Sequence, residues 1–249
     1  MEESLNHGAI AEARLLLAGA RSIAVLTGAG ISAESGIATF RDALTGLWAK
    51  YRPEDLATPE AFRRDPKGVW EWYAWRRERV AGVQPNAGHR ALAKLEADAL
   101  ARGSGFTLLT QNVDGLHHAA GSRRIHELHG NIRRVKCLEA GHPAETWSRE
   151  ESPPRCATCG SWLRPDVVWF GEMLPEGELA AASRAARECD VFLSVGTSGM
   201  VEPAASLAFA ALGQGAAVIE VNPERTPLTE HAAYVFQGPA GTVLPLLAA

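Results

Sequence analysis

The chain has 249 residues, of which 46% are apolar and 22% are charged, and its formal net charge is -4. Its length suits one large α/β domain or a domain with an insertion, and its charge balance leaves no basic surplus for a nucleic-acid partner. The first ten residues lack the bases of a secretory signal, and no apolar run approaches the roughly 18 residues of a membrane span, so we expect a cytoplasmic protein without membrane contact.

The first predicted elements are a packing helix over Ile10–Ala20 and a buried strand over Ser22–Leu26. A glycine-dense loop follows the strand. Its residues Gly28–Ala33 have the spacing G-x-G-x-x-A, which lets the backbone turn tightly and approach a pyrophosphate with its N–H groups. Taken alone, the motif supports a nucleotide site and a plain strand-to-helix turn of small residues equally.

Aromatic and charged residues dominate Leu47–Val83, where we expect a helical insertion in place of the second strand of a plain dinucleotide-binding fold. In a Rossmann dehydrogenase, an acid about 20 residues beyond the glycines holds the ribose at the end of that strand. Glu54 and Asp55 have this offset, but their surroundings do not have the pattern of a strand. Hydride transfer is therefore disfavoured.

One helix of the insertion carries an arginine within an apolar face. A helical wheel over residues 69–80 groups on this face Val69, Trp72, Tyr73, Arg76 and Val80. A guanidinium stays charged in proteins, and a buried unpaired charge is costly, so Arg76 needs an anion. That anion is either a ligand or an internal Asp or Glu, unless the side chain extends to the surface.

A helix over Pro85–Leu100 with Asn86 as its cap and a strand over Gly105–Thr110 come next. Amide and acid groups follow at once in the segment QNVDG, at the edge where open α/β sheets bind ligands. These groups suit a ribose or a carboxamide. The competing interpretation is an Asn/Asp-rich turn that caps the following helix.

The segment IHELHG then places His126 and His129 close together. Two later strands, over Val191–Val195 and Ala217–Val221, end in the groups GTS and NPE, which suit an adenosine. Glu224 in the second group offers the ribose-binding acid that the early chain lacks.

Three of the four cysteines, Cys137, Cys156 and Cys159, lie in one region, a distribution that favours a metal site over a disulfide framework. We expect Cys189 to belong to the core.

The strings TGAGISAESGI, TFR, TQNVDGLHHAAG, ELHGN, VVWFGE, VGTS and EVNPE occur in one order together with the cysteine cluster. This combination resembles the sirtuins, a family of NAD-dependent protein-lysine deacylases, from about Ser22 to the C-terminus. The resemblance implies an α/β fold in which a Rossmann-like NAD-binding domain comprises residues 1–46, 84–132 and 164–249. A smaller domain would combine the helical insertion at 47–83 with a zinc-binding module at 133–163, and the substrate would lie in the cleft between them.

The resemblance also implies that NAD is consumed as a co-substrate and that acylated-lysine proteins are the partners. The acyl carbonyl oxygen attacks the ribose C1′, nicotinamide leaves, and the acyl group ends as O-acyl-ADP-ribose. His129 is the implied general base, since an imidazole with a pKa near ~6.5 accepts a hydroxyl proton at neutral pH. The alternative is a core histidine hydrogen-bonded to the backbone.

The implied cofactor-binding residues fall into three groups. The residues around the pyrophosphate and nicotinamide ribose are Gly28, Ala29, Gly30, Ser32, Ala33, Phe40 and Arg41. The ribose and the nicotinamide amide are held by Gln111, Asn112 and Asp114. The residues toward the adenosine half are Gly196, Thr197, Ser198, Asn222 and Glu224, with Ala240 as a further contact. The substrate peptide is implied to add as a strand to Val168, Trp169, Phe170 and Gly171.

One departure indicates a branch of the family. Many deacetylases read GIPDFR after the glycine loop, whereas this chain reads GIATFR. Together with DLATP and VWEWYAWRR, this resembles the branch that removes succinyl, malonyl and glutaryl groups. Tyr73 and Arg76 are then implied to bind the acyl carboxylate, and Ala57 leaves room for it.

The family pattern leads one to expect four thiolates in two pairs around zinc. The second pair, Cys156 and Cys159, is intact, but only Cys137 remains of the first, because position 140 is alanine. The nearest substitute is His142. Three cysteines and one histidine suit structural zinc; the alternative is that zinc binding has been lost and the module folds without metal.

Three other functions remain open from the sequence. A dehydrogenase would change the oxidation state of nicotinamide. A non-catalytic NAD or ADP-ribose sensor would bind the nucleotide without releasing nicotinamide. Protein ADP-ribosyl transfer would use the same NAD site and leave ADP-ribose on a protein.

Overall fold

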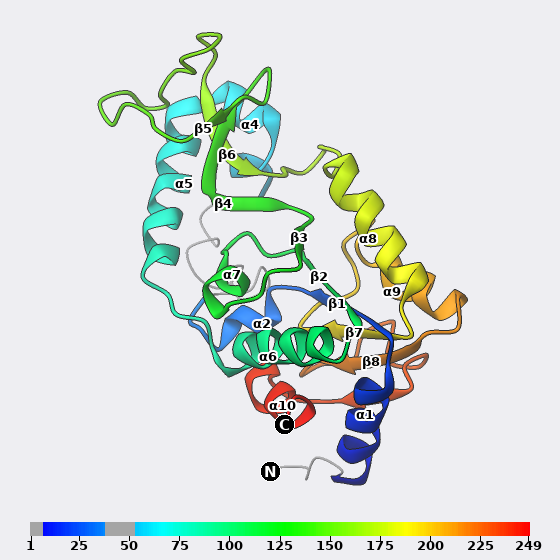
Figure 1. The fold of residues 1–249 in the computed structure, drawn as a ribbon. Helices are drawn as coiled ribbons and strands as arrows, with labels where there is room; N and C mark the ends of the chain where they lie inside the picture. The colour runs from blue at the N-terminus through cyan, green and yellow to red at the C-terminus, as the bar shows by residue number, and fades with distance from the viewer. Residues whose placement is uncertain (1–6, 38–52) are drawn as a thin grey trace.

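The computed structural model describes residues 7–37 and 53–249 (Figure 1). Its larger part is a six-stranded sheet with the order β3-β2-β1-β7-β8-β9, in which every neighbouring pair is parallel. The strands are β1 (Ser22–Thr27), β2 (Gly105–Thr110), β3 (Ile125–Glu127), β7 (Val191–Val195), β8 (Ala217–Val221) and β9 (Tyr234–Phe236). The strand order reverses between β1 and β7, and open α/β sheets bind ligands beyond the strand ends at such a point. The predicted α/β fold class is confirmed.

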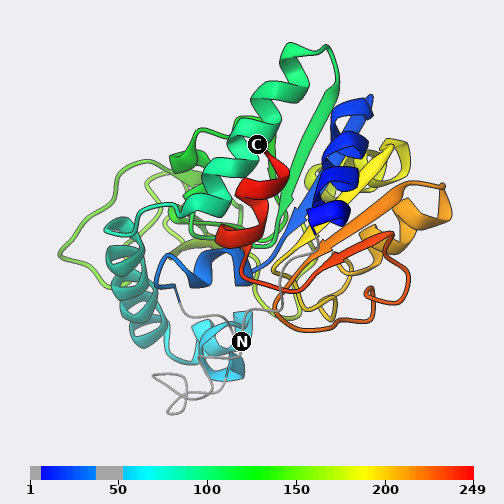
Figure 2. The ribbon, with the colours of Figure 1, turned by 90° about the horizontal axis from the view of Figure 1, so that it is seen from below.

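Helices cover both faces of this sheet (Figures 1 and 2). Side chains alternate along β1, so Ile23 and Val25 belong to the core on one face while Ala24 and Leu26 belong to the core on the other. Burial on both faces explains why the strands are nearly continuous apolar runs in the sequence. The helices are α1 (His7–Gly19), α6 (Ala87–Ala101) and α10 (Ala240–Leu247) on the first face, and α8 (Glu176–Glu188) and α9 (Ser206–Gly213) on the second.

A second body of structure, the small unit, comprises residues 53–81 and 130–167 and lies beyond the strand ends of the large sheet (Figure 1). Its antiparallel sheet has the order β5-β4-β6. Its elements are α3 (Pro53–Leu56), α4 (Pro59–Arg64), α5 (Pro66–Ala81), β4 (Gly130–Cys137), β5 (Pro143–Ala144) and β6 (Leu163–Val167). Residues of both segments share one apolar core, so helices and strands of the small unit stabilise each other.

Local sequence accounts for where the helices of the small unit begin. Thr58 accepts a hydrogen bond from Ala61 N, and Asp65 accepts one from Gly68 N, so both side chains cap helices whose next residue is proline. Asp55 lies on α3 and pairs with Arg64 at 3.1 Å. The expectation that this stretch is not a strand is therefore confirmed.

The predicted apolar face of α5 is only partly correct. Val69, Tyr73 and Val80 are buried, whereas Arg76 and Trp72 are half-buried. Trp70, which lies outside the predicted face, is also buried and packs edge-on against Trp147 at 6.3 Å. A wheel assumes one covered face, but α5 is covered from two sides, which only the tertiary structure decides. Within the described ranges, no helix is both long and apolar enough to cross a membrane.

Candidate active site

The glycine loop after β1 crosses the loop after β7 in close contact. Gly28 N donates to Val195 O at 3.0 Å, and Gly30 N donates to Gly196 O at 2.8 Å. A Cβ at Gly28 would lie 2.8 Å from Gly196 O, and one at Gly196 would lie 2.4 Å from Ile31 N. The glycines are therefore required for the approach of two backbones to each other, a reason that the spacing G-x-G-x-x-A does not reveal. The loop leads into the short helix α2 (Gly30–Ala33).

The loop after β2 joins the parts of the site. Gln111 Nε2 donates to Thr197 Oγ1 at 2.9 Å, which reaches the loop after β7. Asn112 Nδ2 donates to Gly28 O at 3.0 Å, and Ser32 Oγ donates to Asp114 Oδ2 at 2.7 Å. These predicted residues thus lie together at one edge of the sheet. We call them, with His129 and Gly196, the sheet-edge site.

His129 lies just beyond β3, and its Nδ1 is 3.0 Å from Gln111 O. A carbonyl only accepts, so Nδ1 carries the proton in the neutral ring and Nε2 carries the lone pair. Burial lowers the pKa of His129, although the bond to Gln111 acts in the opposite direction. The imidazole is therefore neutral at pH 7, with one basic nitrogen available, as a general base requires.

Gly130 fixes the chain direction directly after this histidine. Its φ is 78°, and a Cβ would lie 2.2 Å from Asp166 O on the neighbouring strand β6. Only glycine accommodates both constraints. The pair His129-Gly130 is thus also the point where the large sheet passes into the small unit.

Sequence reasoning missed a buried polar cluster beneath the glycine loop. His117, on the short helix α7 (Leu116–Ala120), has its Nε2 2.9 Å from Thr27 Oγ1. His89 has its Nε2 3.4 Å from Ser32 Oγ, and the rings of the two histidines are 4.9 Å apart. Burial lowers the pKa of His117 to about 3 and that of His89 to about 4. Both are therefore neutral hydrogen-bonding groups at pH 7; a lone histidine in a helix gave no signal for this.

The carboxyl group of Asp114 belongs to the same cluster. Burial raises its pKa, while hydrogen bonds from Leu116 N and Ser32 Oγ act in the opposite direction. Leu116 N donates to Asp114 Oδ1 at 2.8 Å, and Ser32 Oγ donates to Asp114 Oδ2 at 2.7 Å. Asp114 thus forms the predicted Asp-containing turn before α7, because one carboxylate oxygen accepts from Leu116 N, the first residue of that helix, while the other accepts from Ser32.

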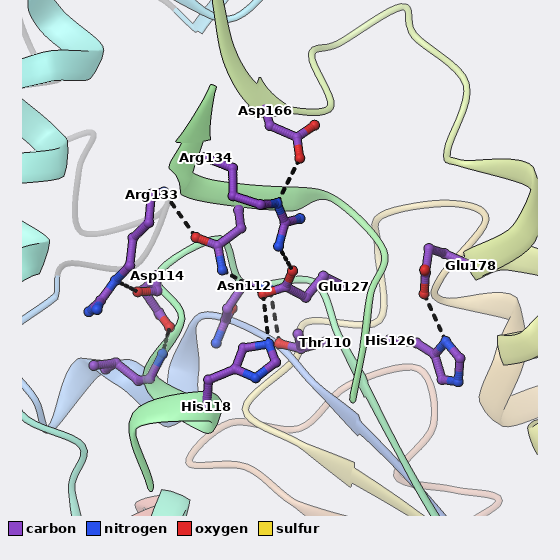
Figure 3. Close-up of polar contacts among 12 residues, drawn as sticks. Thr110, Asn112, Asp114, His118, His126, Glu127, Arg133, Arg134, Asp166 and Glu178 are labelled. Carbon is purple, nitrogen blue, oxygen red and sulfur yellow. Dashed lines mark hydrogen bonds and ion pairs between the residues drawn. The ribbon is translucent and has the colours of Figure 1, made fainter. Parts of the chain in front are cut away.

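A second missed network joins the large sheet to the small unit (Figure 3). The carboxylate of Glu127, at the end of β3, accepts from Asn131 Nδ2 at 2.6 Å and pairs with Arg134. Arg134 also donates to Asp166 Oδ2 at 2.9 Å, and His118 Nε2 lies 3.3 Å from Glu127. His126, the other histidine of the motif IHELHG, instead pairs with Glu178 on α8 at 2.8 Å. The side chain of His126 therefore points toward α8 and not toward Gln111, the hydrogen-bond partner of His129.

The predicted substrate residues lie on two segments of the small unit and its border. Tyr73 is 3% exposed, and its hydroxyl oxygen accepts a hydrogen bond from Trp169 Nε1 at 3.0 Å. The guanidinium of Arg76, one helical turn away, lies 4.8 Å from the centre of the Trp72 ring. Burial lowers the pKa of Arg76, opposed by the nearby Tyr73 and Asp114.

The segment from Val168 to Gly171 uses its main-chain donors inside the protein. Val168 N donates to His129 O, and Phe170 N donates to Ala57 O, both at 2.9 Å. Trp169 N donates to a carboxylate oxygen of Glu172 at 2.8 Å. A substrate strand that adds to this segment would therefore not pair with these three amides.

The predicted adenosine residues follow two adjacent strands. Thr197 is buried and Ser198 half-buried beyond β7, while Gly196 N donates to Val221 O at 2.9 Å. Asn222 Nδ2 donates to the main-chain oxygen of Glu224, whose side chain is exposed. Ala29 is half-buried, Ala33 is exposed, and Ala240, at the start of α10, is buried in the core of the large sheet. Phe40 and Arg41 lie outside the described residues.

Comparison with known proteins identifies the family. The family model described as "Sir2 family" matches residues 28–203. An NAD-dependent protein deacylase of Aquifex aeolicus is 55% identical over 225 residues, which are 90% of this chain and 92% of the relative. This chain belongs to the Sir2 family, the sirtuins. The family and the enzyme class expected from the motifs, NAD-dependent protein deacylase, are thereby confirmed.

Solved structures of sirtuins agree with this assignment. A Sir2 homologue in complex with NAD has a TM-score of 0.87 and 48% identity, covering 96% of this chain and 92% of that one. A Sir2 variant bound to a deacetylated p53 peptide and 3′-O-acetyl ADP ribose has a TM-score of 0.82 and 30% identity, covering 96% of each chain.

The cysteines of this sirtuin come together with a histidine at the outer end of the small unit. Ligand atoms within 4.8 Å of one another are contributed by Cys137, His142, Cys156 and Cys159. Cys137 Sγ lies 3.4 Å from Cys159 Sγ, and Cys156 Sγ lies 3.7 Å from His142 Nδ1. Three thiols and one imidazole at these separations fit tetrahedral zinc, and His142 supplies the fourth ligand atom of the group, which alanine at position 140 lacks. Cys189 is buried in the core, as expected.

Proposed function

We propose that this sirtuin removes succinyl and malonyl groups, with glutaryl as a further substrate and acetyl as a weaker one, from protein lysines at the expense of NAD. Nicotinamide and O-acyl-ADP-ribose are the products. The observation that carries the acyl preference is the placement of Tyr73 and Arg76 one turn apart on α5, with Tyr73 buried and Arg76 half-buried. A hydroxyl donor and a planar cationic donor that are shielded from water to this extent suit an acyl carboxylate.

The sheet-edge site supports the NAD half of this proposal. Gly28–Ser32 would hold the pyrophosphate and Asn112 and Asp114 the nicotinamide ribose, at the switch point where open sheets bind such ligands. His129 Nε2 would take a proton from a ribose hydroxyl, since its Nδ1 is held by Gln111 O. The Sir2 homologue solved with NAD has the same overall fold as this chain.

The test is a kinetic comparison on peptides that differ only in the acyl group. The wild-type protein with NAD should release nicotinamide and deacylated peptide in a one-to-one ratio, with O-acyl-ADP-ribose, on succinyl-lysine. Mass spectrometry separates the alternatives, because ADP-ribose attached to protein would indicate ADP-ribosyl transfer and NAD binding without nicotinamide release would indicate a sensor. Either of these results in place of deacylation would overturn the proposal.

Arg76→Met tests the acyl preference. A hydrogen bond to a charged group contributes about 1.5 to 3 kcal/mol, so kcat/KM for succinyl peptide should fall roughly 10- to 150-fold while that for acetyl peptide is retained. Arg77→Met is the matched control: Arg77 Nε donates to Ile132 O at 2.8 Å, and its guanidinium lies over Trp70 and Trp147. Its loss should affect stability and leave the succinyl-to-acetyl ratio unchanged. An equal fall of both activities in Arg76→Met would contradict the acidic-acyl assignment.

A further inference from the structure

The side chain of Trp169 has a place that strand addition to its main chain does not explain. The ring is 2% exposed, with the guanidinium of Arg164 3.3 Å from its centre and the ring of Phe62 5.3 Å away. Close packing against these two groups fixes the orientation of the indole. Its Nε1–H consequently points to Tyr73 Oη at 3.0 Å.

An ion pair between a buried arginine and a half-buried glutamate holds the turn that carries this tryptophan. Arg164, whose side chain is 4% exposed, donates to both carboxylate oxygens of Glu172 and, from Nη2, to Val167 O at 2.8 Å. Glu172 Oε2 also accepts from Trp169 N at 2.8 Å. Burial raises the pKa of Glu172, but the hydrogen bonds from Arg164 and Trp169 outweigh this and hold the pKa below its ordinary value. The carboxylate stays charged, and the pair fixes residues on both sides of Trp169.

The indole bond has a consequence for the phenol proton. A phenolic hydroxyl donates one hydrogen bond and accepts others. Because Trp169 occupies an acceptor position of Tyr73 Oη, the O–H of Tyr73 has to point away from the indole. Accepting a bond also strengthens the bond that the same hydroxyl donates, by roughly 10 to 30% per bond in chains.

We propose that Trp169 is a positioning residue for acyl selection: its indole N–H holds Tyr73 so that the phenol proton is directed to the acyl carboxylate, and the Arg164–Glu172 pair holds the indole. This inference rests on the proposed acidic-acyl function. It adds a residue that determines acyl selectivity and that lies in the turn after β6, not on α5. It also separates the roles of one residue, whose main chain borders the peptide while its side chain acts on the acyl group. A phenylalanine at position 169 would fill most of the same space without the N–H donor.

Trp169→Phe is therefore the decisive variant. One neutral hydrogen bond is at stake, so kcat/KM for succinyl peptide should fall about two- to tenfold while that for acetyl peptide is nearly unchanged. In the Tyr73→Phe background, the same substitution should not lower the succinyl-to-acetyl ratio any further, because the hydroxyl on which Trp169 acts is already absent. A purely structural role would instead lower both activities in either background.

Trp162→Phe is the matched control. Trp162 packs edge-on against Phe62 at 6.3 Å, and the guanidinium of Arg155 lies 4.9 Å from its ring, so it belongs to the same aromatic core. Within the described part of the chain, the indole that donates to Tyr73 is that of Trp169 and not that of Trp162. The succinyl-to-acetyl ratio of kcat/KM in Trp162→Phe should equal that of the wild-type protein. A second readout does not depend on the folding of Trp169→Phe: one indole N–H resonance of the wild-type protein should move in Tyr73→Phe, because its hydrogen bond is lost.

The outcomes separate the two proposals. A wild-type protein that does not desuccinylate overturns the proposed function and this inference together. A wild-type protein that desuccinylates, with an unchanged ratio in Trp169→Phe or no indole shift in Tyr73→Phe, overturns this inference alone.

Discussion

The sheet-edge site and the small unit are built in different ways. At the sheet edge, main-chain groups and short polar side chains make most of the contacts, as where Asn112 donates to Gly28 O and Gln111 O holds His129. In the apolar core of the small unit, large side chains position one another, as where Phe62 and Arg164 pack against the adjoining Trp169. The difference indicates that the sheet-edge site depends on backbone geometry, while the small unit depends on side-chain packing that substitutions can alter separately.

The largest expected effect tests the chemistry of the sheet edge. His129→Ala should lower kcat on every acyl peptide by about 10² to 10⁴, because a positioned general base is lost, while NAD still binds. In the wild type, activity should fall as pH drops through the pKa of His129, which burial holds below 6.5. Rates are measured by nicotinamide release and NAD binding by calorimetry.

His126→Ala provides the control for this prediction. His126 lies on the same segment and pairs with Glu178 on α8, so its loss should leave kcat within a small factor of wild type. Near-normal turnover in His129→Ala would return that histidine to a structural role.

The next largest expected effect concerns zinc binding in the small unit. The purified protein should hold about one zinc per chain, and Cys156→Ala should lose both zinc and thermal stability, because structural zinc contributes folding free energy directly. His142→Ala should likewise lower the zinc content and the thermal stability. Metal content is measured by elemental analysis and stability by thermal unfolding.

Cys189→Ala is the matched thiol control, since Cys189 lies in the core of the large sheet and should not affect zinc. Absence of zinc from the wild-type protein would show that the small unit folds without metal. Zinc retained in full by His142→Ala would exclude that histidine as a ligand.

The smallest expected effect concerns the buried histidines beneath the glycine loop. The pKa values of His117 and His89 in the folded state, about 3 and about 4, are below the 6.5 of an unperturbed histidine. The unfolded chain therefore binds protons first, and the free energy of unfolding should fall by a few kcal/mol as pH drops from about 6.5 toward 4. Urea denaturation at a series of pH values measures this.

His117→Gln should flatten that dependence, whereas His7→Gln, at an exposed position of α1, should leave it unchanged. An equal slope in His117→Gln would mean that other groups govern the acid sensitivity.

The sequence by itself determined the features that depend on neighbours along the chain. The strand before the glycine loop, the cap at Asn86 and the family motifs are local, and a parallel sheet brings strand ends to one edge whatever lies between them. For the same reason, Gln111, Asn112 and Asp114 were predictable as polar groups at this edge of the sheet. The cysteine cluster was predictable because thiols gathered in one region of a chain commonly serve as metal ligands.

Only the tertiary structure decided which distant side chains meet. The crossing of Gly28 and Gly196, the burial of His89 and His117 and the bond from Trp169 to Tyr73 each join residues far apart in the sequence. No periodicity encodes such contacts, because a helix or strand pattern states which face is apolar and not what covers it. The place of His142 among the three thiols was decided in the same way, by the turn that folds it back onto Cys156.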